Sequence, residues 1–294
     1  RPVKRIVPVV LAVALFMERM DSTIISTSLP AIAADIGTSP IALKLAITTY
    51  LVSLAIFIPI SGWVADRFGA LKIFRLAILV FMIGSIGCAF SNSLEAFVLW
   101  RFVQGAGGSM MTPVGRLILI RSFPRSQLVT AMTYMTLPAV IGPVIGPVLG
   151  GFLTTYLSWR WIFWVNLPFG LLALAGLVVF MQDEGRNDAL RFDWTGFGVL
   201  ALGIGALQMM LDRGEQLDWF GSTEVVVEAV LAGLGLYLFA VHMMTHEKPF
   251  LSPRLFRDRN FAAGLVIMFA IGLVLLATSA LLAPYLQRLS GYPV

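Results

Sequence analysis

Nine long apolar runs, separated by short polar connections, constrain the fold of this chain more than any other feature. The runs cover approximately residues 6–30, 42–65, 73–91, 95–119, 128–156, 161–181, 194–212, 224–245 and 260–286. A helix needs about 20 apolar residues to cross a bilayer core of about 30 Å, and each run approaches or exceeds that length. The sequence therefore predicts an all-α integral membrane protein with nine spans.

The composition of the 294-residue chain excludes a water-soluble domain. Hydrophobic residues make up 58% and charged residues 13%, whereas soluble domains carry about 25% charged residues. The net charge of +5 does not indicate a nucleic-acid partner, because the basic residues form short clusters between apolar runs and not one patch on a folded face. We expect membrane lipid, and no nucleic acid, around the chain.

The distribution of lysine and arginine predicts a cytoplasmic N-terminus, because cytoplasmic loops are enriched in these residues. In this orientation the inside loops contain Arg1, Lys4, Arg5, Arg67, Lys72, Arg75, Arg121, Arg125, Arg186, Arg191, Lys248, Arg254, Arg257 and Arg259. The outside loops contain Lys44, Arg160, Arg213 and Arg288. An odd number of spans also suggests that the chain is a fragment of a longer protein.

The first span contains three ionisable residues, which are costly in a membrane and indicate function. Glu18 and Asp21 are three residues apart and share one helix face, with Arg19 beside them. A carboxylate in apolar surroundings, close to other charges, can exchange a proton near neutral pH. We expect Asp21 to exchange protons and Glu18 to share this role; the alternative is a purely structural ion pair.

The fourth span has a polar, glycine-rich face that cannot contact lipid. Its stripe consists of Arg101, Gln104, Gly105, Gly108, Thr112 and Gly115. At 1.5 Å per residue, Arg101 and Asp21 differ in depth by roughly 5 Å. We therefore predict a direct or water-bridged pair in which Arg101 tunes the proton affinity of Asp21; a buried tether without a transport role is the alternative.

The fifth span repeats a Gly-Pro pattern. Gly142, Gly146 and Gly150 recur every four residues and form a smooth groove against which another helix can pack closely. Pro143 and Pro147 remove backbone donors and bend the helix. A bendable helix in close contact with a neighbour suits a part that moves, although a static packing helix would show the same pattern.

Several motifs together resemble the major facilitator superfamily, and in particular its fourteen-helix drug:proton antiporter branch (EmrB/QacA-like). The resemblance covers essentially the whole chain. The motifs are the loop Gly62–Lys72, the fourth-helix segment Leu99–Gly107, the Gly142–Gly151 run, the first-helix segment Asp21–Pro30 and the segment Ser158–Pro168. Two departures are Ala70-Leu71, which precede a single basic residue in the loop, and the additional charges Glu18 and Arg19.

The resemblance implies an architecture of two six-helix bundles joined by two extra helices. Residues 1–182 would then form the N-terminal bundle, residues 183–258 the inserted pair with flanking loops, and residues 259–294 the first helix of an incomplete second bundle. It also implies alternating access in the bacterial cytoplasmic (inner) membrane, driven by the proton gradient without a cofactor. The residues implied in conformational gating are Gly62, Asp66, Arg67, Gly69, Lys72, Gly142, Pro143, Gly146, Pro147 and Gly150.

The function that follows is proton-coupled efflux of cationic or amphipathic drugs. An apolar, aromatic pocket suits a broad range of such compounds, and its candidate residues are Tyr50, Phe57, Gln104, Trp164 and Asn166. The sequence does not tell whether a periplasmic adaptor protein takes part.

Other functions remain open at this stage. A proton-coupled transporter of one metabolite, in either direction, would show the same motifs. A non-transporting scaffold has no reason to bear buried charges, and an enzyme would need a triad or metal cluster that we do not recognise. His242 and His246 have a spacing that can bind metal, but with no third ligand evident nearby we predict no metal site.

Overall fold

The computed structural model describes residues 3–182 and 191–288. It divides into two units, Arg1–Phe239 and Ala240–Val294, with the boundary inside a helix. Every regular element in the described residues is a helix, which confirms the all-α class. The boundary expected between residues 182 and 183 falls at a segment outside the described residues, and the three-part division stays a prediction.

Each of the nine apolar runs falls on a helix or on helices broken by a short turn. The helices are α1 (Val3–Ile24), α2 (Leu29–Ile36), α3 (Pro40–Phe57), α4 (Ser61–Phe68), α5 (Ala70–Phe90), α6 (Leu94–Ser122), α7 (Arg125–Tyr156), α8 (Trp161–Trp164), α9 (Asn166–Phe180), α10 (Trp194–Arg213), α11 (Thr223–Thr245) and α12 (Arg259–Arg288). One-turn 3-10 helices lie at Ile25–Thr27, Ile58–Ile60, Trp219–Gly221 and Pro253–Arg257.

Six segments of the described chain are both long and apolar enough to cross a membrane. They are Pro40–Phe68, Ala70–Phe90, Arg125–Tyr156, Trp161–Phe180, Trp194–Arg213 and Thr223–Thr245. Helices α1 and α6 have 22 and 29 residues, long enough to span about 30 Å, but their buried charges lower their apolar character. These two helices carry the charged groups that the sequence singles out.

Helix ends follow local chemistry. The hydroxyls of Ser39 and Ser93 accept the backbone N–H of Ala42 and Ala96 at 3.1 and 3.2 Å, so each serine caps its helix. Gly69 joins α4 to α5 with a φ of +97°, a backbone conformation that side chains with a Cβ rarely adopt. The loop motif therefore contains a glycine where the chain requires one.

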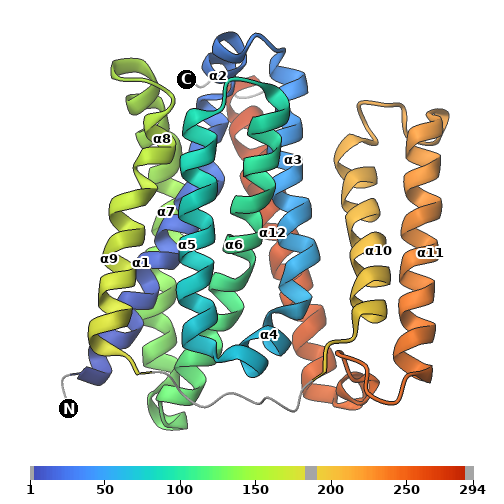
Figure 1. Cartoon of the computed structure of the whole chain (residues 1–294). Coiled ribbons are helices and arrows are strands. Elements are labelled where there is room, and N and C mark those ends of the chain that lie inside the picture. Colours follow the sequence, from blue (N-terminus) through green and yellow to red (C-terminus); the bar gives the residue numbers. More distant parts are fainter. Residues whose placement is uncertain (1–2, 183–190, 289–294) are drawn as a thin grey trace. The chain divides into compact units, whose positions relative to one another are not determined.

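Helix α1 is central in the first unit. It packs against α7, α9 and α6, while α5 and α3 pack against α6; these six helices run side by side (Figure 1). Two apolar clusters form the interior. One includes Met17 and the other begins on α1 at Ile24. The charged residues of α1 lie between them, so the polar site is enclosed by apolar layers.

The glycines of α7 contact α1 directly. An added Cβ at Gly146 would lie 2.2 Å from the hydroxyl of Thr23, and one at Gly150 would lie 2.5 Å from the carbonyl oxygen of Ile24. The expected close packing is therefore confirmed, and its partner is the helix that carries Asp21. A role of this contact in conformational change stays a prediction.

Helix α10 packs against α3 of the bundle. Thr48 of α3 donates a hydrogen bond to Asp212 near one end of α10. Near the other end, the ring of Phe192 lies 4.5 Å from that of Trp63 and 5.6 Å from that of Phe197. The helix is thus attached to the bundle at both of its ends.

The neighbouring glycines of α7 provide a matched test of the packing. Gly150→Ala should lower the melting temperature of the protein in detergent, because the new methyl group collides with the backbone of α1; overpacking costs about 1–3 kcal/mol. Gly151→Ala is the control, since nothing lies within 4 Å of an added Cβ there. It should be neutral or slightly stabilising. Equal melting temperatures for the two variants would contradict the packing described.

Candidate functional site

A network of buried polar side chains surrounds Asp21, whose side chain is inaccessible to solvent. Oδ2 of Asp21 accepts a hydrogen bond from Nη1 of Arg101 at 2.8 Å. Oδ1 accepts from the amide of Gln104 at 3.0 Å and from that of Asn166 at 2.6 Å. The ion pair expected between the first and fourth spans is therefore present as a direct contact.

Arg101 is held from several directions. Its Nη1 also donates to Oε1 of Gln104 at 2.6 Å, one helical turn further along α6. The guanidinium carbon lies 4.3 Å from the ring centroid of Tyr50, a cation–π contact. A charge removed from water is tolerated only when such partners replace its hydration, and the side chain of Arg101 is 1% exposed.

Asn166 connects the network to α5 and α9. The chain turns at Val165, between α8 and α9, and this places Asn166 in the first turn of α9. Its Nδ2 donates to Oδ1 of Asp21 and to the hydroxyl of Ser85 at 2.9 Å. Ser85 in turn donates to the carbonyl oxygen of Phe163 at 2.8 Å. Side chains of α6 and α9 thus bind the carboxylate of α1 directly, and Ser85 of α5 joins the network through Asn166.

Glu18 lies one turn from Asp21 in a second polar group. The hydroxyl of Tyr50 donates to Oε1 of Glu18 at 3.3 Å. Nε of Arg19 lies 3.2 Å from Oε2 of Glu18, and Nη2 of Arg19 lies 3.5 Å from the hydroxyl of Thr112. The side chain of Glu18 is 5% exposed, whereas that of Arg19 is 47% exposed. Arg19 therefore connects a buried acid to an exposed surface.

Three of the five side chains expected to line a substrate pocket belong to the polar groups around Asp21 and Glu18. Tyr50, Gln104 and Asn166 are buried, at 1% exposure or less. Phe57 contacts Phe102 with ring centroids 5.9 Å apart, and Trp164 contacts Phe90 at 5.3 Å. Contact of any of the five with a substrate stays a prediction.

The loop motif places an ion pair at the opposite end of the bundle from the α5–α6 turn. Nη2 of Arg121, at the end of α6, donates to Oδ1 of Asp66 of α4 at 2.5 Å. Gly62 has open space around it, and Lys72 is exposed. The guanidinium of Arg67 lies 6.0 Å from the ring centroid of Phe68. The gating roles of these residues, and of the glycines and prolines of α7, stay predictions.

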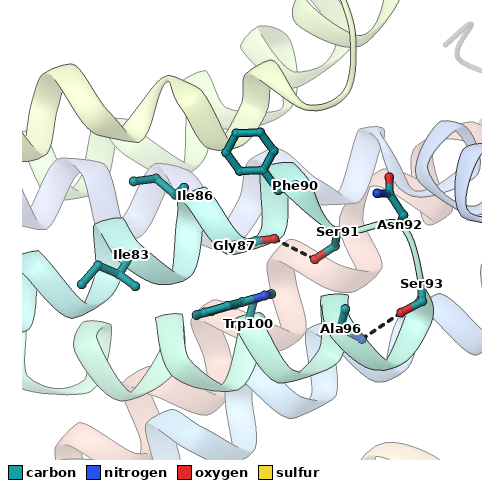
Figure 2. Close-up of a pocket in the computed structure, with 9 residues that line it drawn as sticks. All are labelled: Ile83, Ile86, Gly87, Phe90, Ser91, Asn92, Ser93, Ala96 and Trp100. Atoms are coloured by element: carbon teal, nitrogen blue, oxygen red, sulfur yellow. Dashed lines mark hydrogen bonds between the residues drawn. The ribbon is translucent and has the colours of Figure 1, made fainter.

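A surface groove of about 660 Å³ lies between α5 and α6. Figure 2 shows Trp100 beneath Gly87 at this groove, with Ser91, Asn92 and Ser93 in the turn that closes its end. None of the charged residues described above lines it. The groove is thus separate from the polar network.

Sequence reasoning missed three partners of the site. Ser85 lies in a strongly apolar helix, and only its hydroxyl distinguished it from its neighbours. Thr112 was recognised as part of the α6 stripe but not as the contact of Arg19. Arg121 was assigned to a basic loop, because its pairing with Asp66 depends on how α4 folds back towards α6.

His242 and His246 lie stacked with ring centroids 4.7 Å apart, and the absence of a metal site there stays a prediction.

Comparison with known proteins identifies the family. A family model described as Major Facilitator Superfamily matches residues 11–294. Two relatives named multidrug resistance protein MdtD, from Escherichia coli O1:K1 / APEC and from Escherichia coli O17:K52:H18, are 39% and 40% identical over 261 and 263 residues. In both cases the alignment covers 89% of this chain and 55% of the relative, so the chain spans about half the length of these relatives.

Solved structures show the same fold at low sequence identity. A peptide transporter of the POT family, crystallised with sulfate, aligns with a TM-score of 0.63 at 17% identity, covering 95% of this chain and 60% of its own. The proton:xylose symporter XylE aligns with a TM-score of 0.54 at 13% identity, covering 82% and 54%. The all-helical bundle, its multiple membrane-capable helices and the match over residues 11–294 lead to one conclusion: this chain belongs to the major facilitator superfamily of membrane transporters.

Proposed function

We propose that this chain is part of a proton-coupled antiporter that exports amphipathic or cationic small molecules across the bacterial inner membrane by alternating access. The N-terminus would lie in the cytoplasm. The relatives named multidrug resistance protein support efflux of drugs, and the inward proton gradient would supply the energy.

The observation that carries this proposal is the ion pair of Asp21 and Arg101, which is buried in the interior of a membrane protein. Charged groups within membrane spans commonly mark proton and substrate pathways. A purely structural contact at this position could be made by apolar side chains without the cost of removing two charges from water. Gain and loss of a proton by Asp21 during transport would therefore explain the buried pair better than a structural role does.

Protonation of Asp21 would loosen the network in a definite way. The neutral carboxyl group no longer attracts Arg101 and needs an acceptor for its own proton, so contacts to α6 and α9 weaken together. Helix α1 is also the partner of the α7 glycines, where close backbone approach allows one helix to shift against another. A proton bound at Asp21 would thus affect α1, which contacts both the Arg101 network and the glycines of α7.

The pair of Asp66 and Arg121 would act as a latch at the cytoplasmic end. Their side chains are 46% and 34% exposed, and exposed ion pairs contribute only about 0–1 kcal/mol to stability. Such a weak contact can break and form in each cycle. Gly62, Arg67, Gly69 and Lys72 of the same motif would shape and charge this end of the bundle.

Variants that remove the charges of Asp21 and Arg101 distinguish a proton-exchanging role of Asp21 from a structural one. Asp21→Asn should abolish uncoupler-sensitive efflux of a fluorescent drug by the full-length protein, and it should also lower the melting temperature, because an unpaired buried Arg101 costs about 3–5 kcal/mol. The double variant Asp21→Asn, Arg101→Gln removes both charges and should recover most of the melting temperature. It should not recover efflux.

Efflux by the stable double variant at the parental rate would refute the role of Asp21 in proton coupling. Proteoliposomes with an imposed pH gradient provide the direct measurement, since dye movement against its own gradient then reports coupling. The parent protein with an uncoupler serves as the reference for zero coupling.

The latch makes a different prediction. Asp66→Asn should shift the melting temperature by no more than about 2 °C, because the pair is exposed and worth about 0–1 kcal/mol, yet it should reduce efflux several-fold by altering the balance between the two access states. Asp35→Asn, at an exposed pair with Arg160 that lies outside the Gly62–Lys72 loop, is the control and should leave efflux nearly unchanged. Parental efflux by Asp66→Asn would exclude the latch.

A further inference from the structure

The surface groove between α5 and α6 has apolar walls along its length. They consist of Ile83, Ile86 and Phe90 from α5 and of Ala96 and Trp100 from α6. Ile83 and Phe90 are large exposed side chains, and they belong to a helix that is long and apolar enough to cross a membrane. Exposed apolar surface on such a helix contacts lipid. The groove of about 660 Å³ therefore opens towards the bilayer.

A glycine and a tryptophan form the floor of the groove. An added Cβ at Gly87 would lie 2.1 Å from a ring carbon of Trp100, so the indole ring lies directly on the backbone of α5. Figure 2 shows this ring between the two helices. Because Gly87 has no side chain, the two helices leave a recess above the ring. The floor is aromatic and apolar, which suits a flexible hydrocarbon chain.

The length of the groove matches the depth of one lipid leaflet. Between Ile83 and Ser91, which both line the groove, the chain rises about 12 Å at 1.5 Å per residue. One leaflet contributes about 15 Å to a hydrocarbon core of about 30 Å. The turn that follows Phe90 connects two helices long enough to span the membrane, so it lies at a membrane surface. The groove therefore extends from that surface to near the middle of the bilayer.

The polar end of the groove offers a hydrogen-bond donor beside a cation. The hydroxyls of Ser91 and Ser93 bond to backbone groups of the two helices, at 2.7 and 3.2 Å (dashed lines in Figure 2). Asn92 is exposed, and its Oδ1 accepts a hydrogen bond from Nη2 of Arg160 at 3.1 Å. Its amide nitrogen donates no hydrogen bond within the described part of the chain. Asn92 can therefore donate to a phosphate that lies close to the charge of Arg160.

An acid lies beside the same turn. Glu95 is exposed in the first turn of α6, next to Ala96 of the groove, and it forms no ion pair with any residue that the structure describes. Arg160, in contrast, is paired with Asp35 at 2.9 Å. The polar end thus presents a donor and a cation for a phosphate, and a separate carboxylate for an amine. This distribution of charge is complementary to a zwitterionic headgroup and not to an anionic one.

We propose that this groove binds one phospholipid, with an acyl chain along Trp100 and a phosphoethanolamine headgroup at Asn92, Arg160 and Glu95. The primary ammonium group donates charge-assisted hydrogen bonds to the carboxylate of Glu95, which the trimethylammonium group of a choline lipid cannot do. With the N-terminus in the cytoplasm, the lipid belongs to the outer leaflet. A molecule that is polar at one end and apolar along its length fits the groove, because no charged side chain lines it.

Native mass spectrometry of the full-length protein, released from detergent micelles, measures the affinity for the first bound lipid. The probe is dioleoyl phosphatidylethanolamine. Ala96→Trp fills the groove beside Trp100 and should weaken binding by about tenfold. Ala175→Trp is the control, because it is the same substitution at an exposed position of α9 outside the groove. It should change the affinity by less than about twofold.

The headgroup is tested at exposed positions, where substitution does not endanger folding. The parent protein should bind phosphatidylethanolamine several-fold more tightly than phosphatidylcholine with the same acyl chains. Glu95→Gln should abolish this preference, whereas Glu215→Gln, which removes an exposed acid from the turn between α10 and α11, should retain it. Asn92→Ala should weaken binding of both lipids several-fold, because both contain the phosphate. These variants decide the matter even if Ala96→Trp does not fold.

Equal lipid affinities of Ala96→Trp and Ala175→Trp would overturn the proposal, because the bound lipid would then lie elsewhere on the surface. A parent protein without a headgroup preference, or a preference that Glu95→Gln leaves unchanged, would do so as well. If Ala96→Trp lost binding of the exported fluorescent drug and retained that of the lipid, the groove would be a substrate site instead. None of these measurements needs a proton gradient, so the result is independent of the role of Asp21.

Discussion

The structure depends on how charge is held in a membrane interior. Asp21 and Arg101 are inaccessible to water, and each would be strongly destabilising alone. The amides of Gln104 and Asn166 replace the water that the carboxylate loses, and the ring of Tyr50 lies against the guanidinium. Because these partners come from different helices, satisfying the buried ion pair fixes the relative positions of α1, α3, α6 and α9.

The same helix makes a close backbone contact with α7. Glycines of α7 lie directly on α1 near Thr23 and Ile24, immediately beyond the charged turn. Apolar surface cannot drive this association in lipid, so close van der Waals packing between small residues takes its place. The helix that carries the buried charges therefore packs directly against a helix whose contact residues are small and uncharged.

Much of this arrangement could be predicted from the sequence because the membrane limits the alternatives. The length of the apolar runs predicted the long helices but not the short helix α2 (Leu29–Ile36), and depth along a helix predicted the pairing of Asp21 with Arg101. The positions of Asn166 and Ser85 could not be predicted, since they depend on the turn at Val165 and on the packing of α5 against α9. Likewise, the hydrogen bond of Tyr50 to Oε1 of Glu18 depends on angles between side chains, which spacing does not reveal.

The attachment of α10 has a consequence for mobility. Thr48 and Asp212 join α10 to α3 near one end, and aromatic rings around Phe192 join it near the other. Two well-separated anchor points oppose pivoting of α10 on the bundle. We therefore expect α10 and the bundle to behave as one rigid part in any conformational change.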